Sequence, residues 1–140
     1  EMNSKEEFRL LNQAFSSLFE KYKYSVIKYV YNEGEFGNYE VVFRIDTIKL
    51  RVIRDKGQIF FEVNSLTELD EWFDFGLVLE LLEIQIDPPK RNQLKRHVEI
   101  LDENLYKIRT IFSAENYYQT KINLKKIGKV RAERMFGLNG

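Results

Sequence analysis

Apolar residues recur every three or four positions over residues 4–22, and this spacing predicts an amphipathic helix. Ser4 and Glu7 have the spacing of a capping box, in which a hydroxyl and a carboxylate satisfy free amides at the start of a helix. The apolar stripe is expected to face the core, and it consists of Phe8, Leu11, Phe15, Leu18, Phe19 and Tyr22.

Four short segments rich in β-branched and aromatic residues follow, and they predict four strands. These strands span residues 24–31, 39–46, 48–54 and 58–63. The connections are too short for parallel crossovers, so an antiparallel meander is expected. A two-residue turn at Lys56-Gly57 pairs Val52 with Phe61 and Arg54 with Ile59, which keeps the apolar side chains on one face. A three-residue turn would need a bulge to do the same.

Three more helices are predicted, at residues 75–84, 90–114 and 120–136, with Asp74 placed to cap the first. The second contains a heptad stripe formed by Leu94, Val98, Leu101, Leu105, Ile108 and Phe112. In a short chain such a stripe packs on a sheet or a neighbouring helix, and the seam of a dimeric coiled coil is the alternative. The order α-β-β-β-β-α-α-α predicts an α+β fold, a four-stranded antiparallel meander packed against helices, in a single domain of residues 1–140.

The chain has 22 basic and 22 acidic residues, but they are distributed unevenly. Residues 1–85 carry a net charge of −6 and residues 86–140 a net charge of +6. Seven acidic residues and no basic residue lie within residues 62–83, around the single tryptophan. Either the two halves pack together and neutralise each other, or one of them faces a charged partner.

The residue types that most enzymes use are scarce, because the chain has no cysteine and only one histidine, His97. A lone histidine beside Lys95 and Arg96 is expected at a helix flank or on the surface rather than in a metal site. The sequence has neither a phosphate-binding glycine loop nor a nucleophile elbow. We therefore predict a protein that is not an enzyme and has no cofactor or metal. With no apolar run of membrane length and no signal peptide, it is expected to be cytoplasmic, with no membrane association, as a monomer or a dimer.

The outer face of the predicted sheet mixes arginines with apolar residues, which is typical of a recognition surface. The single tryptophan lies among acidic residues, as in an aromatic anchor of an interface. The alternatives are that a loop or the last helix covers this face and that the tryptophan fills a joint between sheet and helix. The candidate partner-binding residues are Glu68, Asp70, Glu71, Trp72, Asp74, Arg44, Arg51 and Phe60.

The last predicted helix is basic, so a nucleic-acid-binding or regulatory module is the alternative function. The residues that would contact phosphates are Lys121, Lys125, Lys126, Lys129, Arg131 and Arg134. This segment lacks interleaved aromatic residues and base-reading motifs, which makes a solvated or acid-paired helix face the competing interpretation. A third hypothesis, an enzyme, would need carboxylates to converge with Arg51 or Arg54 in a pocket.

Three motifs between residues 24 and 84 form a recognisable pattern: Phe36-Gly37-Asn38, then Asp55-Lys56-Gly57-Gln58 after an arginine-bearing strand, then Trp72-Phe73-Asp74 before a leucine-rich helix. The pattern resembles a group of small bacterial proteins of the immunity type, which neutralise a cognate toxin by binding it. The resemblance implies a protein partner, such as a toxin domain, and carries over no site residues because immunity surfaces vary with the toxin. Both lines of argument predict a non-enzymatic protein-binding module.

Overall fold

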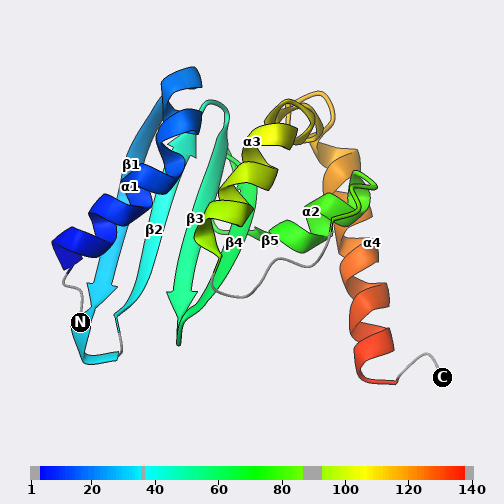
Figure 1. The fold of residues 1–140 in the computed structure, drawn as a ribbon. Coiled ribbons are helices and arrows are strands. Elements are labelled where there is room, and N and C mark those ends of the chain that lie inside the picture. Colours follow the sequence, from blue (N-terminus) through cyan, green and yellow to red (C-terminus); the bar gives the residue numbers. More distant parts are fainter. Residues whose placement is uncertain (1–3, 36, 87–92, 138–140) are drawn as a thin grey trace.

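The computed structural model describes residues 4–35, 37–86 and 93–137. It has an α+β fold in which a five-stranded antiparallel sheet has the strand order β1-β2-β3-β4-β5 (Figure 1). The elements are α1 (Ser4–Lys21), β1 (Tyr24–Asn32), the 3₁₀ turn η1 (Glu33–Glu35), β2 (Asn38–Ile45), β3 (Ile48–Asp55), β4 (Gln58–Ser65), β5 (Phe73–Asp74), α2 (Phe75–Leu81), α3 (Leu94–Ile111) and α4 (Tyr117–Met135). The predicted fold class is therefore confirmed.

The register of the hairpin between β3 and β4 matches the predicted two-residue turn. Val52 pairs with Phe61 and Arg54 with Ile59. Lys56 and Gly57 both have positive φ, 52° and 80°, as a two-residue hairpin turn requires. On the other side of the sheet, β1 is an edge strand that pairs with β2, and its register shifts between Val26 and Lys28.

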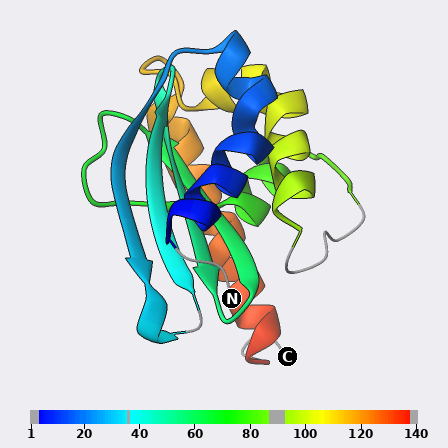
Figure 2. The same ribbon diagram turned by 60° about the vertical axis from the view of Figure 1, so that its left-hand side comes forward.

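The inner face of the sheet is covered by α1 and α3, which lie side by side (Figure 2). Phe15 of α1 packs its ring against Phe43 of β2 and Phe61 of β4 at centroid distances of 5.0 and 6.0 Å. The heptad stripe of α3 is buried within this core from Val98 to Phe112. Its packing on the sheet and on α1 confirms the intrachain interpretation of the stripe.

The short helix α2 packs against α4, which runs along the β5 side of the molecule (Figure 1). Leu124 of α4 is fully buried, and a Cβ added at Gly128 would lie 3.7 Å from Leu77 of α2. In the described part of the chain, none of the helices has the length and the apolar character needed to span a membrane.

Several local predictions differ from the structure. Glu7 reaches Arg54 of β3 at 2.5 Å rather than closing a capping box, and Ser4 Oγ lies 3.3 Å from Tyr29 Oη. Asp74 stands at the N-cap of α2, but its side chain makes no capping hydrogen bond. The strand β5 was not predicted, because two residues are too few to show an alternation.

The helix ends also differ from the predicted ranges. The helix α2 ends at Leu81 instead of residue 84, and α4 begins at Tyr117 instead of residue 120. Residues 90–92 of the third predicted helix lie outside the described residues. His97 is buried against Phe61 in the first turn of α3, with a ring distance of 5.0 Å, so the expected surface position is wrong.

Candidate functional site

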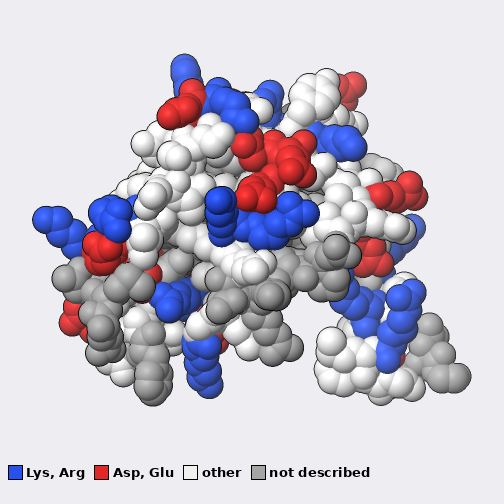
Figure 3. All heavy atoms as spheres, viewed as in Figure 1, with Lys and Arg blue, Asp and Glu red and all other residues white. Residues whose placement is uncertain are grey.

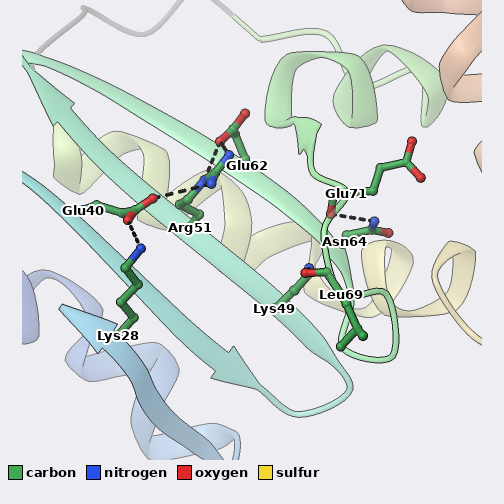
Figure 4. A network of polar contacts seen from close by, with 8 residues as sticks. All are labelled: Lys28, Glu40, Lys49, Arg51, Glu62, Asn64, Leu69 and Glu71. Carbon is green, nitrogen blue, oxygen red and sulfur yellow. Dashed lines mark hydrogen bonds and ion pairs between the residues drawn. The ribbon is translucent and has the colours of Figure 1, made fainter. Parts of the chain in front are cut away.

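A row of charged side chains crosses the outer face of the sheet from β1 to β4 (Figure 4). Lys28 Nζ lies 2.8 Å from Glu40, and Arg51 bridges Glu40 at 3.5 Å to Glu62, to which its Nε donates a hydrogen bond of 2.6 Å. Arg51 is the direct cross-strand partner of Glu62, whereas Lys28 and Arg51 both reach Glu40 diagonally across neighbouring strands. Charged groups that satisfy one another in this way hold fixed positions on the surface.

Trp72 lies over this face next to the charged row. Its ring centre is 4.1 Å from Lys49 Nζ and 4.6 Å from the guanidinium carbon of Arg51, which is a double cation–π contact. Lys49 is only 5% exposed, and burial lowers the pKa of its ammonium group. The predicted outer face of β3 is therefore partly covered at this end, as in the alternative that a loop covers it, because the tryptophan folds back over it.

The segment of residues 66–72, which we call the acidic loop, connects β4 to β5 on the outer side of the sheet (Figure 2). Its backbone is fastened at two points: Lys49 Nζ donates to the carbonyl of Leu69 in the middle of the loop at 3.1 Å, and Asn64 Nδ2 donates to the carbonyl of Glu71 near its end at 2.9 Å (Figure 4). Leu69 at the tip of this loop is 85% exposed. A large apolar side chain is thus presented to solvent by an anchored backbone.

Glu71 connects the acidic loop to α4. Its carboxylate lies 3.0 Å from Lys121 Nζ and 3.3 Å from Lys125 Nζ. The hydrogen bond from Lys121 lowers the pKa of Glu71, and the same contact raises the pKa of Lys121. The acidic stretch and the basic helix therefore neutralise each other at this point.

A second set of ion pairs, further along α4, joins this helix to acidic residues of β5 and α2. Arg131 Nη1 lies 3.5 Å from Asp74, and Nη2 lies 3.1 Å from Glu80. By contrast, Glu68 and Asp70 make no ion pair within the described residues. The carboxylates on the two sides of Leu69 interact with cations at longer range, both with Lys49 and Glu68 also with Lys121.

The basic residues of α4 also fall into two groups, those with an ion pair and those without one. Lys121, Lys125 and Arg131 are engaged with carboxylates of the chain itself. Three further basic side chains are exposed without an ion pair in the ranges that the structure describes, namely Lys126, Lys129 and Arg134. Figure 3 shows charges of both signs interspersed on the face that it presents rather than one continuous basic field.

The structure brings only part of the predicted partner-binding set together. Trp72 and Arg51 are in contact, whereas Arg44 and Phe60 lie at opposite ends of the same face, where Arg44 Nε donates to the carbonyl of Asp46. Glu71 and Asp74 are turned toward α4. Sequence reasoning missed Lys49 and Leu69, although a leucine between two acidic residues in a predicted loop was a usable signal.

The residues proposed for an enzyme site do not converge. Arg51 lies on the outer face and Arg54 pairs with Glu7 on the inner face. No cluster of three or more metal-ligating side chains occurs among the described residues. Comparisons with protein-family models, with curated proteins and with solved structures give no match.

Proposed function

We propose that the chain is a protein-binding module and that the acidic loop is its contact site. The observation that carries the proposal is the 85% exposure of Leu69 on a backbone held by Lys49 and Asn64. Ordering a loop on binding costs conformational entropy, and a loop that is already fastened avoids much of that cost. An exposed leucine on such a loop is therefore suited to insert into a partner's apolar pocket.

The charge around Leu69 indicates the chemistry of the partner. Glu68 and Asp70 flank the leucine, and neither carboxylate lies within ion-pair distance of a cation of the described chain, although Lys49 attracts both at longer range. A partner with basic residues around an apolar pocket would complement this loop, and opposite charges would speed the encounter. A basic toxin domain is one partner of this kind, and the resemblance to immunity proteins favours it.

The experiment uses the intact chain as bait in the cells from which its gene comes, alongside the variant Leu69→Asp. We expect one protein to be retained by the unmodified chain and lost by the variant. The exposed Tyr106 of α3 offers a matched control, because Tyr106→Asp changes a surface apolar residue elsewhere. Retention that is equal for all three baits would reject the acidic loop as the contact site.

Toxin neutralisation is tested separately. Co-production of the chain should restore the growth of cells that produce the captured partner, and Leu69→Asp should remove this protection. If the captured partner does not impair growth, the protein-binding function still stands, but the immunity role is refuted.

The nucleic-acid alternative is favoured by one observation, the three unpaired basic residues Lys126, Lys129 and Arg134 on α4. It requires an affinity for DNA or RNA that falls steeply with salt and that weakens in the charge reversals Lys126→Glu and Lys129→Glu. Binding that does not depend on salt would exclude it.

A further inference from the structure

The outer face of the sheet remains open over most of its width. The helices α1 and α3 pack on the inner face and α2 packs with α4, while the acidic loop folds over the outer face at Lys49 and Arg51. A solvated face of an antiparallel sheet is usually polar, yet this one presents Val30 and Phe60 at 49% and 42% exposure. Exposed apolar side chains among charged ones are typical of a surface that another molecule covers.

The strand register arranges the outer side chains in three rows that cross the sheet from β1 to β4. The first row has Val30 of β1 at one end and Phe60 of β4 at the other. The second row has Lys28 of β1 and Glu62 of β4 at its ends (Figure 4). The third row has the exposed Arg44 in its β2 half, whereas the acidic loop covers its β3 half. In each row, therefore, the half at β1 and β2 complements the half at β3 and β4.

The charged ends of these rows have capacity for a further contact. Lys28 Nζ contacts Glu40, and its side chain remains 55% exposed. Arg51 Nε and Nη2 both contact Oε1 of Glu62, so Oε2 is left to accept a hydrogen bond from another cation. The carboxylate of Asp70 in the acidic loop is exposed and lies outside ion-pair distance of the described cations. Each half of the face can thus bind the opposite half of a second molecule.

We infer that two copies of this chain associate through their outer faces, about a two-fold axis that runs parallel to the strands between β2 and β3. A two-fold interface brings the same patch of both copies together, so the patch has to complement itself. This axis lays each row on the same row of the second copy with its ends exchanged. Val30 of one copy then faces Phe60 of the other, and Lys28 faces Glu62. Sheets stacked in this way lie about 10 Å apart with their strands nearly aligned.

The acidic loop fits the same arrangement. Because it covers only the β3 half of the third row, the loop of each copy lies over the exposed Arg44 of the other, and the two loops do not collide. The carboxylate of Asp70 then meets that guanidinium in a charge-assisted contact. A second copy and the partner proposed for Leu69 would exclude each other, although neither depends on the other.

Sedimentation velocity over a wide range of concentrations should show the chain converting from a monomer into a dimer. We expect Phe60→Asp and Lys28→Glu each to weaken the dimer by about tenfold or more, because each sets a carboxylate against an apolar or an acidic side chain. Matched controls lie on α3, on the opposite side of the sheet. Tyr106→Asp and Lys107→Glu are equivalent changes at exposed residues and should leave the dimer intact. Well below the dissociation constant the chain is a monomer, so substitutions on the outer face then act within one copy alone.

A mixture of two charge variants tests the pairing itself. Lys28→Glu sets two carboxylates against each other in its own dimer, and Glu62→Lys sets two ammonium groups against each other. In a dimer of one variant with the other, both contacts join opposite charges again. We expect fluorescein-labelled Lys28→Glu to sediment as a monomer alone and as a dimer after unlabelled Glu62→Lys is added. Misfolded chains would not produce this recovery, so the result is independent of effects on stability.

A chain that stays monomeric at every concentration would overturn the inference, as would a dimer that the controls weaken equally or that the mixture does not recover. A dimer that survives Phe60→Asp but is lost in Ile27→Pro would indicate pairing through the edge of β1. A captured partner that a monomeric chain loses through Phe60→Asp would assign the outer face to that partner. Both results would contradict the proposed dimer. The contact role of Leu69 is decided separately, by Leu69→Asp in the capture experiment.

Discussion

The guanidinium of Arg51 lies 4.6 Å from the centre of the Trp72 ring while its Nε donates a hydrogen bond of 2.6 Å to Glu62. One side chain thereby connects the acidic loop to the charged row in the middle of the sheet. The position of the loop consequently depends on a residue that is far from it in the sequence.

Substituting Arg51 should lower the stability of the fold measurably. Arg51→Gln removes the ion pairs with Glu40 and Glu62, and we expect the free energy of unfolding to fall by about 1–2 kcal/mol in urea titrations. Arg44→Gln is the matched control on the same face, where Arg44 is exposed, and its effect should stay within about 0.5 kcal/mol. Equal losses in the two variants would contradict a central role of Arg51.

Lys49 should matter more for the acidic loop than for the stability of the whole chain. Lys49→Met loses the hydrogen bond to Leu69 and the contact with Trp72, but it also ends the cost of burying an ammonium group. We expect the free energy of unfolding to change by less than about 1 kcal/mol, whereas amide hydrogen exchange in residues 66–72 becomes faster. The fluorescence of Trp72, the single tryptophan, should shift as well. Lys28→Met, which does not touch the ring, should leave both readouts unchanged.

The contact of Glu71 with α4 should give a defined pH dependence. Its pKa is lowered from the ordinary value of 4.5, so the ion pair stabilises the fold above that pH and the stabilisation is lost as the pH falls through the lowered pKa. Glu71→Gln should therefore cost about 0.5–1 kcal/mol at neutral pH and almost nothing near pH 2, as measured by chemical unfolding at both pH values. The exposed Glu103, substituted by glutamine, should show no such difference.

The left-handed conformation at Glu83 predicts a substitution that stabilises the chain. Glu83→Gly relieves the backbone at the end of α2 and should raise the free energy of unfolding by about 1 kcal/mol. The same change at Glu103, in the interior of α3, should lower it by a similar amount because glycine is a poor helix former. Opposite signs for one substitution at two sites can be checked by thermal unfolding. A loss of stability in Glu83→Gly would contradict this prediction, because it would show that the Glu83 side chain stabilises the fold by more than the left-handed backbone destabilises it.

Local patterns predicted most of the sheet and the position of the core. The alternation in β2, β3 and β4 predicted which face of the sheet is buried, and the turn at Lys56-Gly57 predicted the register of the hairpin. Both features depend only on residues that are close in the sequence. The heptad stripe of α3 identified the face that packs inward for the same reason. These features are encoded within a few turns or a few strand residues.

The candidate site was less predictable because it is built from distant residues. The alternation assigned Lys49 to the outer face, and the alternative that a loop covers this face holds at Lys49, because Trp72 folds back and buries it. Glu7 looked like a capping residue, yet Arg54 lies within reach once α1 has packed on the sheet. The burial of His97 likewise follows from tertiary packing, since the heptad stripe of α3 passes through its neighbour Val98 and not through His97 itself.

The irregular register of β1 between Val26 and Lys28 has a consequence for the behaviour of the molecule in concentrated solution. An open edge strand invites other chains to extend the sheet, and a bulge together with a lysine discourages such growth. At the other edge, β5 has only two residues and passes directly into α2. Neither edge of the sheet therefore offers a long, regular strand with which other chains could pair. This protects the chain, whose edge strand β1 carries exposed apolar residues, against assembly into fibrils.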